Sequence, residues 1–394
     1  GLFTALFAPL AFDWAWEHPL LILVAAALMP ASARLDWRRL PGLEQSTLQL
    51  VVATSLGIAL LCCWQIYVIV GEDGPRSAAA WWLAGVTFGG LVVSQWRWLA
   101  LPLLAVAMLA EGGMLTVKET LNGMRQRSYF GIYTVRYDPV AKLRTIAHGT
   151  TLHGQQSTDP RLRLTPLSYY GPSSGAGIAF GHAQTMFGAS ARIGVVGLGA
   201  GSLACYHRPG ESWRFFEIDP LVLSYSENRT FTYLKDCAPD ARVVIGDARL
   251  ELEKVAPASL DLLAVDAFSS DAIPLHLLTD EALGVYERAL APRGILLIHI
   301  SNRFIDLEPV LSVDARKKGL TARKREDNPD MTQGYTASTW IALSRDPAML
   351  AALQAQAPND PWEPLAASTS QVWTDDHASI LPHVRWQNIL GVPK

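Results

Sequence analysis

Three glycines, Gly197, Gly199 and Gly201, follow the apolar run 192–196 in a short segment with the spacing G-x-G-x-G. Glycines at the end of a strand let the backbone turn tightly and let a ligand come close to it. The G-x-G-x-x-G spacing of dinucleotide-binding folds is absent here. The shorter loop leaves no clear seat for a pyrophosphate, and it favours an adenosine-methionine ligand.

Two acidic residues follow the next two apolar runs. Glu217 ends the run Phe215-Phe216-Glu217, and Asp247 stands before Ala248 after the run 242–246. In an open α/β sheet, ligands bind beyond the carboxyl ends of the strands. A carboxylate at Glu217 is placed to accept hydrogen bonds from ribose hydroxyls, and one at Asp247 from an adenine amino group. Taken alone, Glu217 is equally compatible with a helix cap or a surface carboxylate.

Asp266 ends a fourth apolar run, and Asp271 follows it five residues later. An alkylammonium has a pKa near 10, so at neutral pH it has no free lone pair. A carboxylate at the ligand edge of the sheet attracts such a cation and takes its proton as the nitrogen attacks. Asp266 is therefore the candidate general base, with a helix cap or a loop carboxylate as the alternative for both residues.

The elements that position these residues alternate along the chain. Strands are predicted at 192–197, 213–219, 242–246, 260–266 and 294–301, with helix-length segments between them. This alternation predicts a parallel sheet that is covered on both faces. A late edge strand is expected at 339–343, and a small antiparallel hairpin at 131–136 and 143–148. The basic runs 316–318 and 323–325 are expected to be solvated helix or loop surface.

The N-terminal part has a different composition. Half of the 394 residues are hydrophobic, the charged fraction is 18% and the mean hydropathy is +0.17. The run 47–70 contains no charge and is long enough to cross a bilayer core of about 30 Å. Shorter candidates are 18–33, 78–94 and 98–110, and buried helices of a soluble protein are the alternative. Arg34, Arg38 and Arg39 place their loop in the cytoplasm by the positive-inside rule, which leaves the side of residue 112 undecided.

The charge and the cysteines restrict the function further. A net charge of −3 gives no reason to expect a nucleic-acid partner. The four cysteines Cys62, Cys63, Cys205 and Cys237 show no metal-ligand spacing. Their number and spacing suggest no disulfide framework, which fits a reducing cytosolic environment for the catalytic part. His153, His182 and His299 are expected to be core or surface residues rather than ligands.

The chain resembles the spermidine synthase (polyamine aminopropyltransferase) family, and most closely its membrane-fused bacterial branch. The resemblance covers about residues 130–305 and more loosely the C-terminal region. The following segments carry it: Leu152-His153-Gly154-Gln155-Gln156, Tyr169-Tyr170, the glycine loop 196–202, Glu217-Ile218-Asp219, Gly246-Asp247-Ala248 and Val265-Asp266. It implies a small β-domain followed by a Rossmann-like domain, and transfer of an aminopropyl group from decarboxylated S-adenosylmethionine to a polyamine nitrogen.

The resemblance also implies roles for single residues. Gln156 resembles a glutamine beside the sulfonium end of the co-substrate, and Tyr170 a tyrosine that lines the amine site. Glu217 and Asp247 resemble the ribose and adenine ligands, and Asp266 the proton-accepting aspartate. The family usually has two aspartates three residues apart before a proline, and a histidine and a glutamate after the tyrosine. This chain departs from both patterns, which leaves the acceptor amine and decarboxylation of the donor open.

Together these observations predict an α/β fold: a Rossmann-like S-adenosylmethionine-dependent methyltransferase-type domain, preceded by a small β-hairpin domain and an N-terminal transmembrane helical region. The expected divisions are 1–112, 113–185 and 186–394. The first hypothesis is a membrane-anchored aminopropyltransferase that uses a small cationic amine and no metal, in the bacterial inner membrane with a cytoplasmic catalytic domain. Alternatives are a methyltransferase using intact S-adenosylmethionine, and a non-catalytic transport or sensing protein. The family resemblance implies a homodimer.

Overall fold

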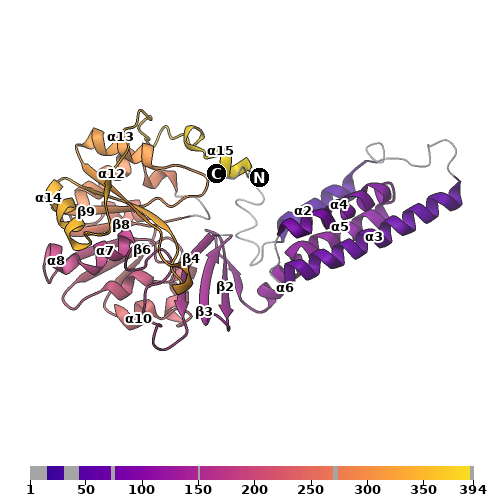
Figure 1. Cartoon of the computed structure of the whole chain (residues 1–394), viewed down its shortest axis with the longest axis horizontal. Helices are drawn as coiled ribbons and strands as arrows, with labels where there is room; N and C mark the ends of the chain where they lie inside the picture. The colour runs from indigo at the N-terminus through magenta and orange to yellow at the C-terminus, as the bar shows by residue number, and fades with distance from the viewer. Residues whose placement is uncertain (1–15, 31–43, 72–75, 150, 269–273, 391–394) are drawn as a thin grey trace. The chain divides into compact units, whose positions relative to one another are not determined.

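The computed structural model describes residues 16–30, 44–71, 76–149, 151–268 and 274–390, and it divides into two compact units, 1–132 and 133–394. Figure 1 shows a helical first unit and an α/β second unit. Arg34, Arg38 and Arg39, which orient the apolar runs in the sequence, lie outside the described residues, and so does Asp271. Each unit is described by itself.

Each apolar run predicted in the first unit overlaps a helix, and residues 31–33 of the run 18–33 lie outside the described residues. Its elements are α2 (Glu17–Leu28), α3 (Gln45–Gly71), α4 (Arg76–Val93), α5 (Arg97–Met108), a π turn (Leu109–Gly113), α6 (Met114–Leu121) and the short strand β1 (Arg125–Arg127). Gly89 of α4 lies so close to α3 that an added Cβ would stand 2.6 Å from the Cβ of Ala59. Small residues at this contact let the two helix backbones approach each other closely.

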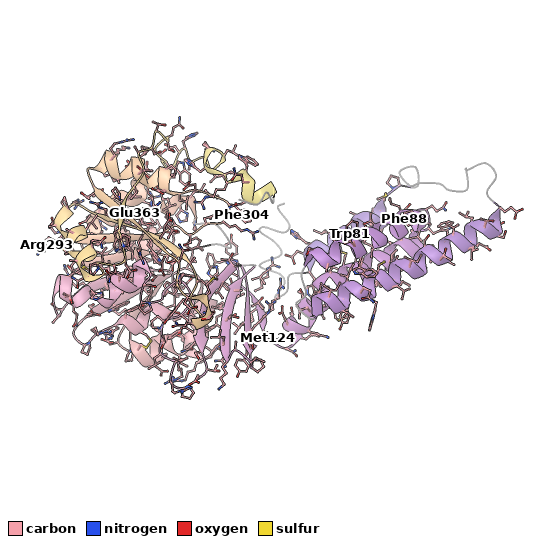
Figure 2. All side chains as sticks on the ribbon, viewed as in Figure 1. Trp81, Phe88, Met124, Arg293, Phe304 and Glu363 are labelled. Carbon is pink, nitrogen blue, oxygen red and sulfur yellow. A yellow bond between two sulfur atoms is a disulfide. The ribbon has the colours of Figure 1, made fainter. Side chains whose placement is uncertain are left out.

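Two described helical stretches, Gln45–Gly71 and Arg97–Leu121, are long and apolar enough to cross a membrane by length and composition. The helices α2 and α4 are shorter apolar helices. Large apolar side chains of α4 point away from the unit's core, and Trp81 and Phe88 are 85% and 65% exposed (Figure 2). The first unit thus presents apolar surface that a water-soluble helical bundle normally buries.

The second unit begins with a small antiparallel sheet. It contains β2 (Ile132–Asp138), β3 (Leu143–His148) and β4 (Thr151–Ser157). The predicted hairpin corresponds to β2 and β3. The third strand was not predicted, because its sequence Thr-Leu-His-Gly-Gln-Gln-Ser lacks the apolar alternation of a half-buried strand.

The main sheet has eight strands in the order β12-β10-β11-β9-β8-β5-β6-β7. The strands are β5 (Arg192–Val196), β6 (Ser212–Glu217), β7 (Arg242–Ile245), β8 (Leu260–Val265), β9 (Leu290–His299), β10 (Thr321–Asp327), β11 (Ser338–Ser344) and β12 (Glu363–Pro364). The five strands from β5 to β9 are parallel, which confirms the predicted α/β class. β11 runs antiparallel to both of its neighbours.

Successive residues of a strand point to opposite faces of the sheet, and here both faces carry apolar side chains. Helices cover both faces and bury these side chains. One face packs against helices α7 (Gly175–Gly181), α8 (Ala183–Phe187), α9 (Pro220–Glu227), α10 (Tyr233–Cys237) and α14 (Pro347–Gln356). The other face packs against α11 (Ala248–Glu253), α12 (Asp280–Ala289) and α13 (Glu308–Lys318). The second unit also contains two short 3₁₀ turns, η5 (Ser202–Tyr206) and η6 (Leu275–Leu277), and the helix α15 (Trp386–Leu390).

Two predictions for the late strands are wrong. The run 323–325 is part of β10 rather than solvated surface, and Arg325 is buried with an ion pair of 2.6 Å to Asp360. Lys324 contacts Glu308 at 2.8 Å. Carboxylates within the fold therefore neutralise these cations, a long-range arrangement that local sequence does not show. The strand at 339–343 exists, but it is not an edge strand, because β10 pairs with its outer side.

A disulfide joins Cys205 of η5 to Cys237 of α10. The number and spacing of the cysteines suggested no disulfide framework, and the bond corrects that interpretation for this pair. Thirty-two residues separate the two cysteines, so only the fold brings η5 and α10 together. Because disulfides persist mainly in oxidising compartments, this bond is an argument against the expected reducing environment of the catalytic part.

Candidate active site at the carboxyl edge of the sheet

The predicted site residues follow the carboxyl ends of neighbouring parallel strands. Gly197 follows β5, Glu217 ends β6, Asp247 follows β7 and Asp266 follows β8. Parallel pairing places these ends at the same edge of the sheet. One pocket is lined by all four residues, together with Gly199, Ala248 and Tyr170.

The glycine loop forms one wall of this pocket. Gly197 has φ +96°, and its N–H donates to the Phe216 carbonyl oxygen at 2.8 Å. A Cβ at Gly197 would collide with the Asp266 carbonyl oxygen, and one at Gly199 with the His153 carbonyl oxygen. Both positions therefore require glycine because the backbone of another segment passes directly beside them. Gly201 also has a positive φ of +82°.

Glu217 connects the second strand end to the glycine loop. Its Oε2 accepts from the Leu198 N–H and its Oε1 from the Asp219 N–H, both at 2.9 Å. The residue is 7% exposed and lines the pocket. Burial raises the pKa of the Glu217 carboxyl to about 7, although the backbone donors of Asp219 and Leu198 oppose this shift. Each carboxylate oxygen retains a lone pair for a ligand hydroxyl.

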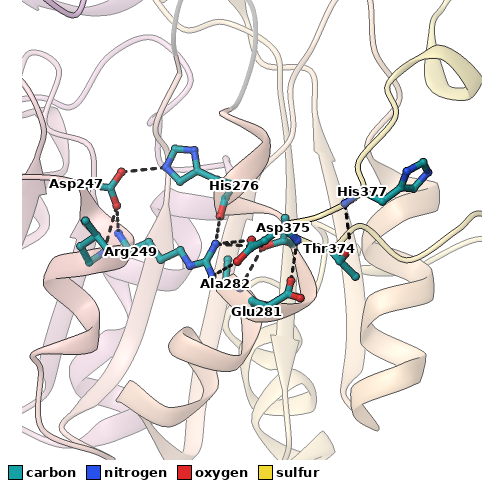
Figure 3. Close-up of polar contacts among 10 residues, drawn as sticks. Asp247, Arg249, His276, Glu281, Ala282, Thr374, Asp375 and His377 are labelled. Atoms are coloured by element: carbon teal, nitrogen blue, oxygen red, sulfur yellow. Dashed lines mark hydrogen bonds and ion pairs between the residues drawn. The ribbon is translucent and has the colours of Figure 1, made fainter.

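Asp247 caps the helix α11 and contacts a histidine (Figure 3). Its Oδ1 accepts from the Arg249 and Leu250 N–H groups at 3.0 and 3.1 Å, and its Oδ2 lies 3.0 Å from the His276 Nε2. His276 also lines the pocket, so it belongs to this wall, although no motif in the sequence singles it out. Asp247 thus has a structural role as well as access to a ligand.

Apolar side chains complete the wall between Glu217 and Asp247. Ile218, Ala248, Leu277 and Pro274 all line the pocket. An adenine ring needs flat apolar surfaces on its faces and polar groups at its edge. These residues, with the carboxylates of Glu217 and Asp247 beside them, fit an adenosine group. Among the described residues there is no cluster of three or more histidine, cysteine or acidic side chains arranged to hold a metal.

The opposite wall contains the candidate base. The Tyr170 hydroxyl donates a hydrogen bond to the Asp266 Oδ2, and the Asp266 side chain is only 3% exposed. Tyr206 donates to the Tyr170 carbonyl oxygen at 2.6 Å, which fixes the tyrosine backbone. Burial and the neighbouring Asp266 hold the pKa of Tyr170 well above its ordinary value, so its phenol stays a hydrogen-bond donor. The structure therefore brings Tyr170 and Asp266 together across 96 residues of sequence.

His299, expected to be an ordinary core or surface residue, is bonded to the candidate base. It ends β9, and its Nδ1 lies 2.7 Å from the Asp266 Oδ1. Its Nε2 lies 2.7 Å from the Ser301 Oγ. The signal that was missed is positional, because His299 ends a parallel strand as Glu217 does.

The other predicted site residues lie elsewhere or are not described. Gln156 is buried, and its amide bonds to Thr232 and to the Arg163 carbonyl oxygen. It is not among the residues that line the pocket, so its predicted place beside the sulfonium is not supported. The exposed Asp375 near the C-terminus forms a two-pronged ion pair with Arg249 (Figure 3).

Part of the chain is similar in sequence to a curated protein. The chain is 32% identical over 111 residues to the polyamine aminopropyltransferase of Vibrio vulnificus, which covers 27% of this chain and 36% of that protein. The chain thus aligns with little more than a third of the length of this curated relative. No protein-family model matches the chain.

Solved structures are similar in fold at low sequence identity. A probable spermidine synthase from Corynebacterium glutamicum is 18% identical with a TM-score of 0.47, covering 64% of this chain and 95% of the other. Human methyltransferase-like protein 13, in complex with SAH, is 19% identical with a TM-score of 0.36, covering 52% and 96%. The aligned segment of the Vibrio vulnificus relative confirms the predicted resemblance to the spermidine synthase family.

Proposed function

We propose that the chain is an aminopropyltransferase that moves an aminopropyl group from decarboxylated S-adenosylmethionine to a small cationic amine. The observation that carries this proposal is the Tyr170–Asp266 contact in the pocket that the glycine loop, Glu217 and Asp247 also line. The sequence similarity to a polyamine aminopropyltransferase supports the same reaction. Glu217 then binds the ribose hydroxyls and Asp247 the adenine edge.

The reaction joins the amine nitrogen to the carbon next to sulfur and breaks the bond between that carbon and sulfur. The electron pair of the broken bond stays on sulfur, and methylthioadenosine leaves. The amine must lose a proton to expose its lone pair, and the Asp266 carboxylate accepts it. Tyr170 keeps its own proton and holds the Asp266 Oδ2 in place. Alignment of nitrogen, carbon and sulfur in one pocket supplies much of the remaining rate.

The first unit is proposed to anchor this enzyme in a membrane. Two helical stretches have the required length and apolar composition, and α4 exposes large aromatic side chains. The side of the membrane on which the second unit lies stays a prediction, and so does a homodimer. Partition of the full chain into detergent after carbonate washing of membranes tests the anchor. Release of the chain by the wash contradicts it.

The reaction is tested by its products. Purified full-length protein is offered decarboxylated or intact S-adenosylmethionine together with a panel of diamines, polyamines and monoamines. Methylthioadenosine that appears only with an amine supports aminopropyl transfer. S-adenosylhomocysteine from the intact donor supports a methyltransferase instead. If neither product forms although methylthioadenosine binds tightly, the result favours the non-catalytic alternative.

A further inference from the structure

Asp266 does not act alone, because a chain of three hydrogen bonds ends on it. The Thr339 backbone N–H donates to the Ser301 Oγ at 2.7 Å. The Ser301 Oγ is 2.7 Å from the His299 Nε2, and the His299 Nδ1 is 2.7 Å from the Asp266 Oδ1. The histidine and aspartate side chains are 4% and 3% exposed, so water does not replace these contacts.

The direction of donation in these three hydrogen bonds follows from their two ends. The Asp266 carboxylate only accepts, so the imidazole proton of His299 stands on Nδ1. The Nε2 of the neutral ring is then an acceptor. The Ser301 hydroxyl donates to this Nε2, while its oxygen accepts from the Thr339 backbone N–H. This arrangement corresponds to the neutral Nδ1–H tautomer of His299.

Aromatic side chains fix the plane of the imidazole ring. Trp340 stacks on one side, with ring centroids 4.4 Å apart and planes 16° apart. Tyr169 also stacks on the ring, at 4.8 Å and 28°, and Phe268 meets it edge-on at 5.1 Å. The ring therefore has little freedom to turn its Nδ1 away from Asp266.

We propose that His299 is a positioning residue for the proton transfer, with Ser301 and Thr339 setting its tautomer. The inference rests on the proposed function and deepens it. The Nδ1–H of His299 holds Oδ1 and the Tyr170 hydroxyl holds Oδ2, so both oxygens of the base are fixed. One lone pair on each oxygen remains to take the amine proton. The imidazole does not take this proton, because its Nδ1 already carries one.

The same residue types form the triads of serine hydrolases, in which a histidine activates a serine nucleophile. Here the Ser301 Oγ accepts a hydrogen bond from the Thr339 backbone N–H and donates its own proton to the His299 Nε2. The serine thus orients the histidine, and the carboxylate at the far end performs the chemistry.

Two amide substitutions at position 299 separate positioning from packing. The side-chain nitrogen of His299→Asn stands near the position of Nδ1 and can still donate to Asp266. That of His299→Gln stands near Nε2 and cannot. We expect kcat to fall roughly 100-fold in His299→Gln, since misplacement of a reacting group by about 1 Å costs this much. In His299→Asn the loss should stay within about tenfold, and methylthioadenosine should bind both variants as tightly as the wild type.

His182→Asn is the control for removal of a half-buried imidazole away from Asp266, because His182 bonds to the Ile178 carbonyl oxygen within its own helical segment. Equal kcat values for the Asn and Gln variants at position 299, whether both high or both low, overturn the proposal. A wild-type protein that makes no methylthioadenosine with any amine overturns the proposed function instead.

A second measurement needs no turnover. Nitrogen-15 NMR of histidine-labelled full-length protein reports which ring nitrogen of His299 carries a proton, with the resonance assigned by its loss in His299→Asn. We expect the proton on Nδ1 in the wild type, and transfer of part of the population to Nε2 in Ser301→Ala. A wild-type proton on Nε2 overturns the inference whatever the reaction is.

Discussion

The two walls of the pocket are built in different ways. The adenosine wall consists of the glycine loop, Glu217 and Asp247, and their hydrogen bonds run to backbone N–H groups nearby or on a neighbouring strand. The aspartate wall consists of Tyr170, Asp266 and His299, whose side chains bond to one another across 33 to 96 residues. The carboxylates of the first wall thus bond mainly to backbone groups at the strand ends. The side chains of the second wall bond to one another, and only the fold brings them together.

Because the two walls are built separately, we expect one to determine ligand affinity and the other the turnover number. Substitutions on the adenosine wall should weaken ligand affinity, and those on the aspartate wall should slow the reaction while affinity is kept. The four predictions below test that separation, beginning with the largest expected effect.

Asp266→Asn should lower kcat by roughly 10²- to 10⁴-fold, because an amide does not accept the amine proton. The dissociation constant of methylthioadenosine should change by less than about threefold, as measured by calorimetry. Asp261→Asn is the matched control, since Asp261 lies at the opposite end of the same strand and pairs with Arg192. An unchanged kcat in Asp266→Asn removes this residue from the mechanism.

Gly197→Ala should lose affinity for methylthioadenosine. The positive φ and the collision with the Asp266 carbonyl oxygen together cost about 2–4 kcal/mol, which is roughly 30- to 1,000-fold in affinity. Gly188→Ala is the control, because Gly188 has φ +92° but open space around its Cβ position. Gly188→Ala should keep the affinity of the wild type, and an unchanged affinity in Gly197→Ala would contradict the place of Gly197 in the adenosine wall.

Glu217→Gln should weaken methylthioadenosine binding by roughly 10- to 100-fold, since hydrogen bonds to a charged acceptor contribute about 1.5–3 kcal/mol. The turnover number at saturating donor should be nearly unchanged. Glu211→Gln serves as the control, because Glu211 is buried just before the same strand, at its other end, and bonds to Trp213. A fall in kcat without a loss of affinity would contradict the assignment of Glu217 to the adenosine wall.

Affinity should also depend on pH. The pKa of Glu217 is raised to about 7 in the folded protein, so its carboxyl is mostly protonated at pH 6 and mostly ionised at pH 8. An ionised carboxylate accepts two hydroxyl donors, so methylthioadenosine affinity should rise roughly fivefold over this range. Folding stability should change in the opposite sense. The raised pKa means that the contribution of Glu217 is greatest below 4.5 and is lost as the pH rises through about 7.

Asp314→Asn is the control for that pH dependence. Asp314 is fully buried in α13, and burial raises its pKa to about 7 as well, but it does not line the pocket. Its substitution should alter the pH dependence of stability and leave that of ligand affinity unchanged. Loss of the affinity change in Asp314→Asn, or its persistence in Glu217→Gln, would contradict the prediction.

The contrast between the walls also explains which site residues can be predicted from the sequence. Glu217 and Asp266 each follow an apolar strand-length run, so their place at the sheet edge can be read from local pattern. The parallel sheet follows from the same alternation. Gln156 was assigned by resemblance alone, and its side chain bonds to Thr232 instead.

Long-range contacts account for most of what was missed. Nothing near His299 in sequence indicates that Trp340 stacks on it or that its Nδ1 contacts Asp266. The Cys205–Cys237 bond and the Arg325–Asp360 ion pair depend in the same way on segments that only the fold brings together. Local pattern therefore predicts elements and strand ends, whereas partners between distant side chains require the structure.

The position of β11 has a consequence for how the protein is made. The ribosome produces β9, then β10, then β11, yet β11 inserts between the other two in the sheet. Until residue 344 has been synthesised, β9 keeps an unpaired edge and His299 lacks Trp340. A nascent chain or fragment that stops after β10 would hold the glycine loop and both adenosine carboxylates, but its base would not be fixed. Binding competence should therefore arise earlier in synthesis than turnover, and the C-terminal strands determine when the enzyme is finished.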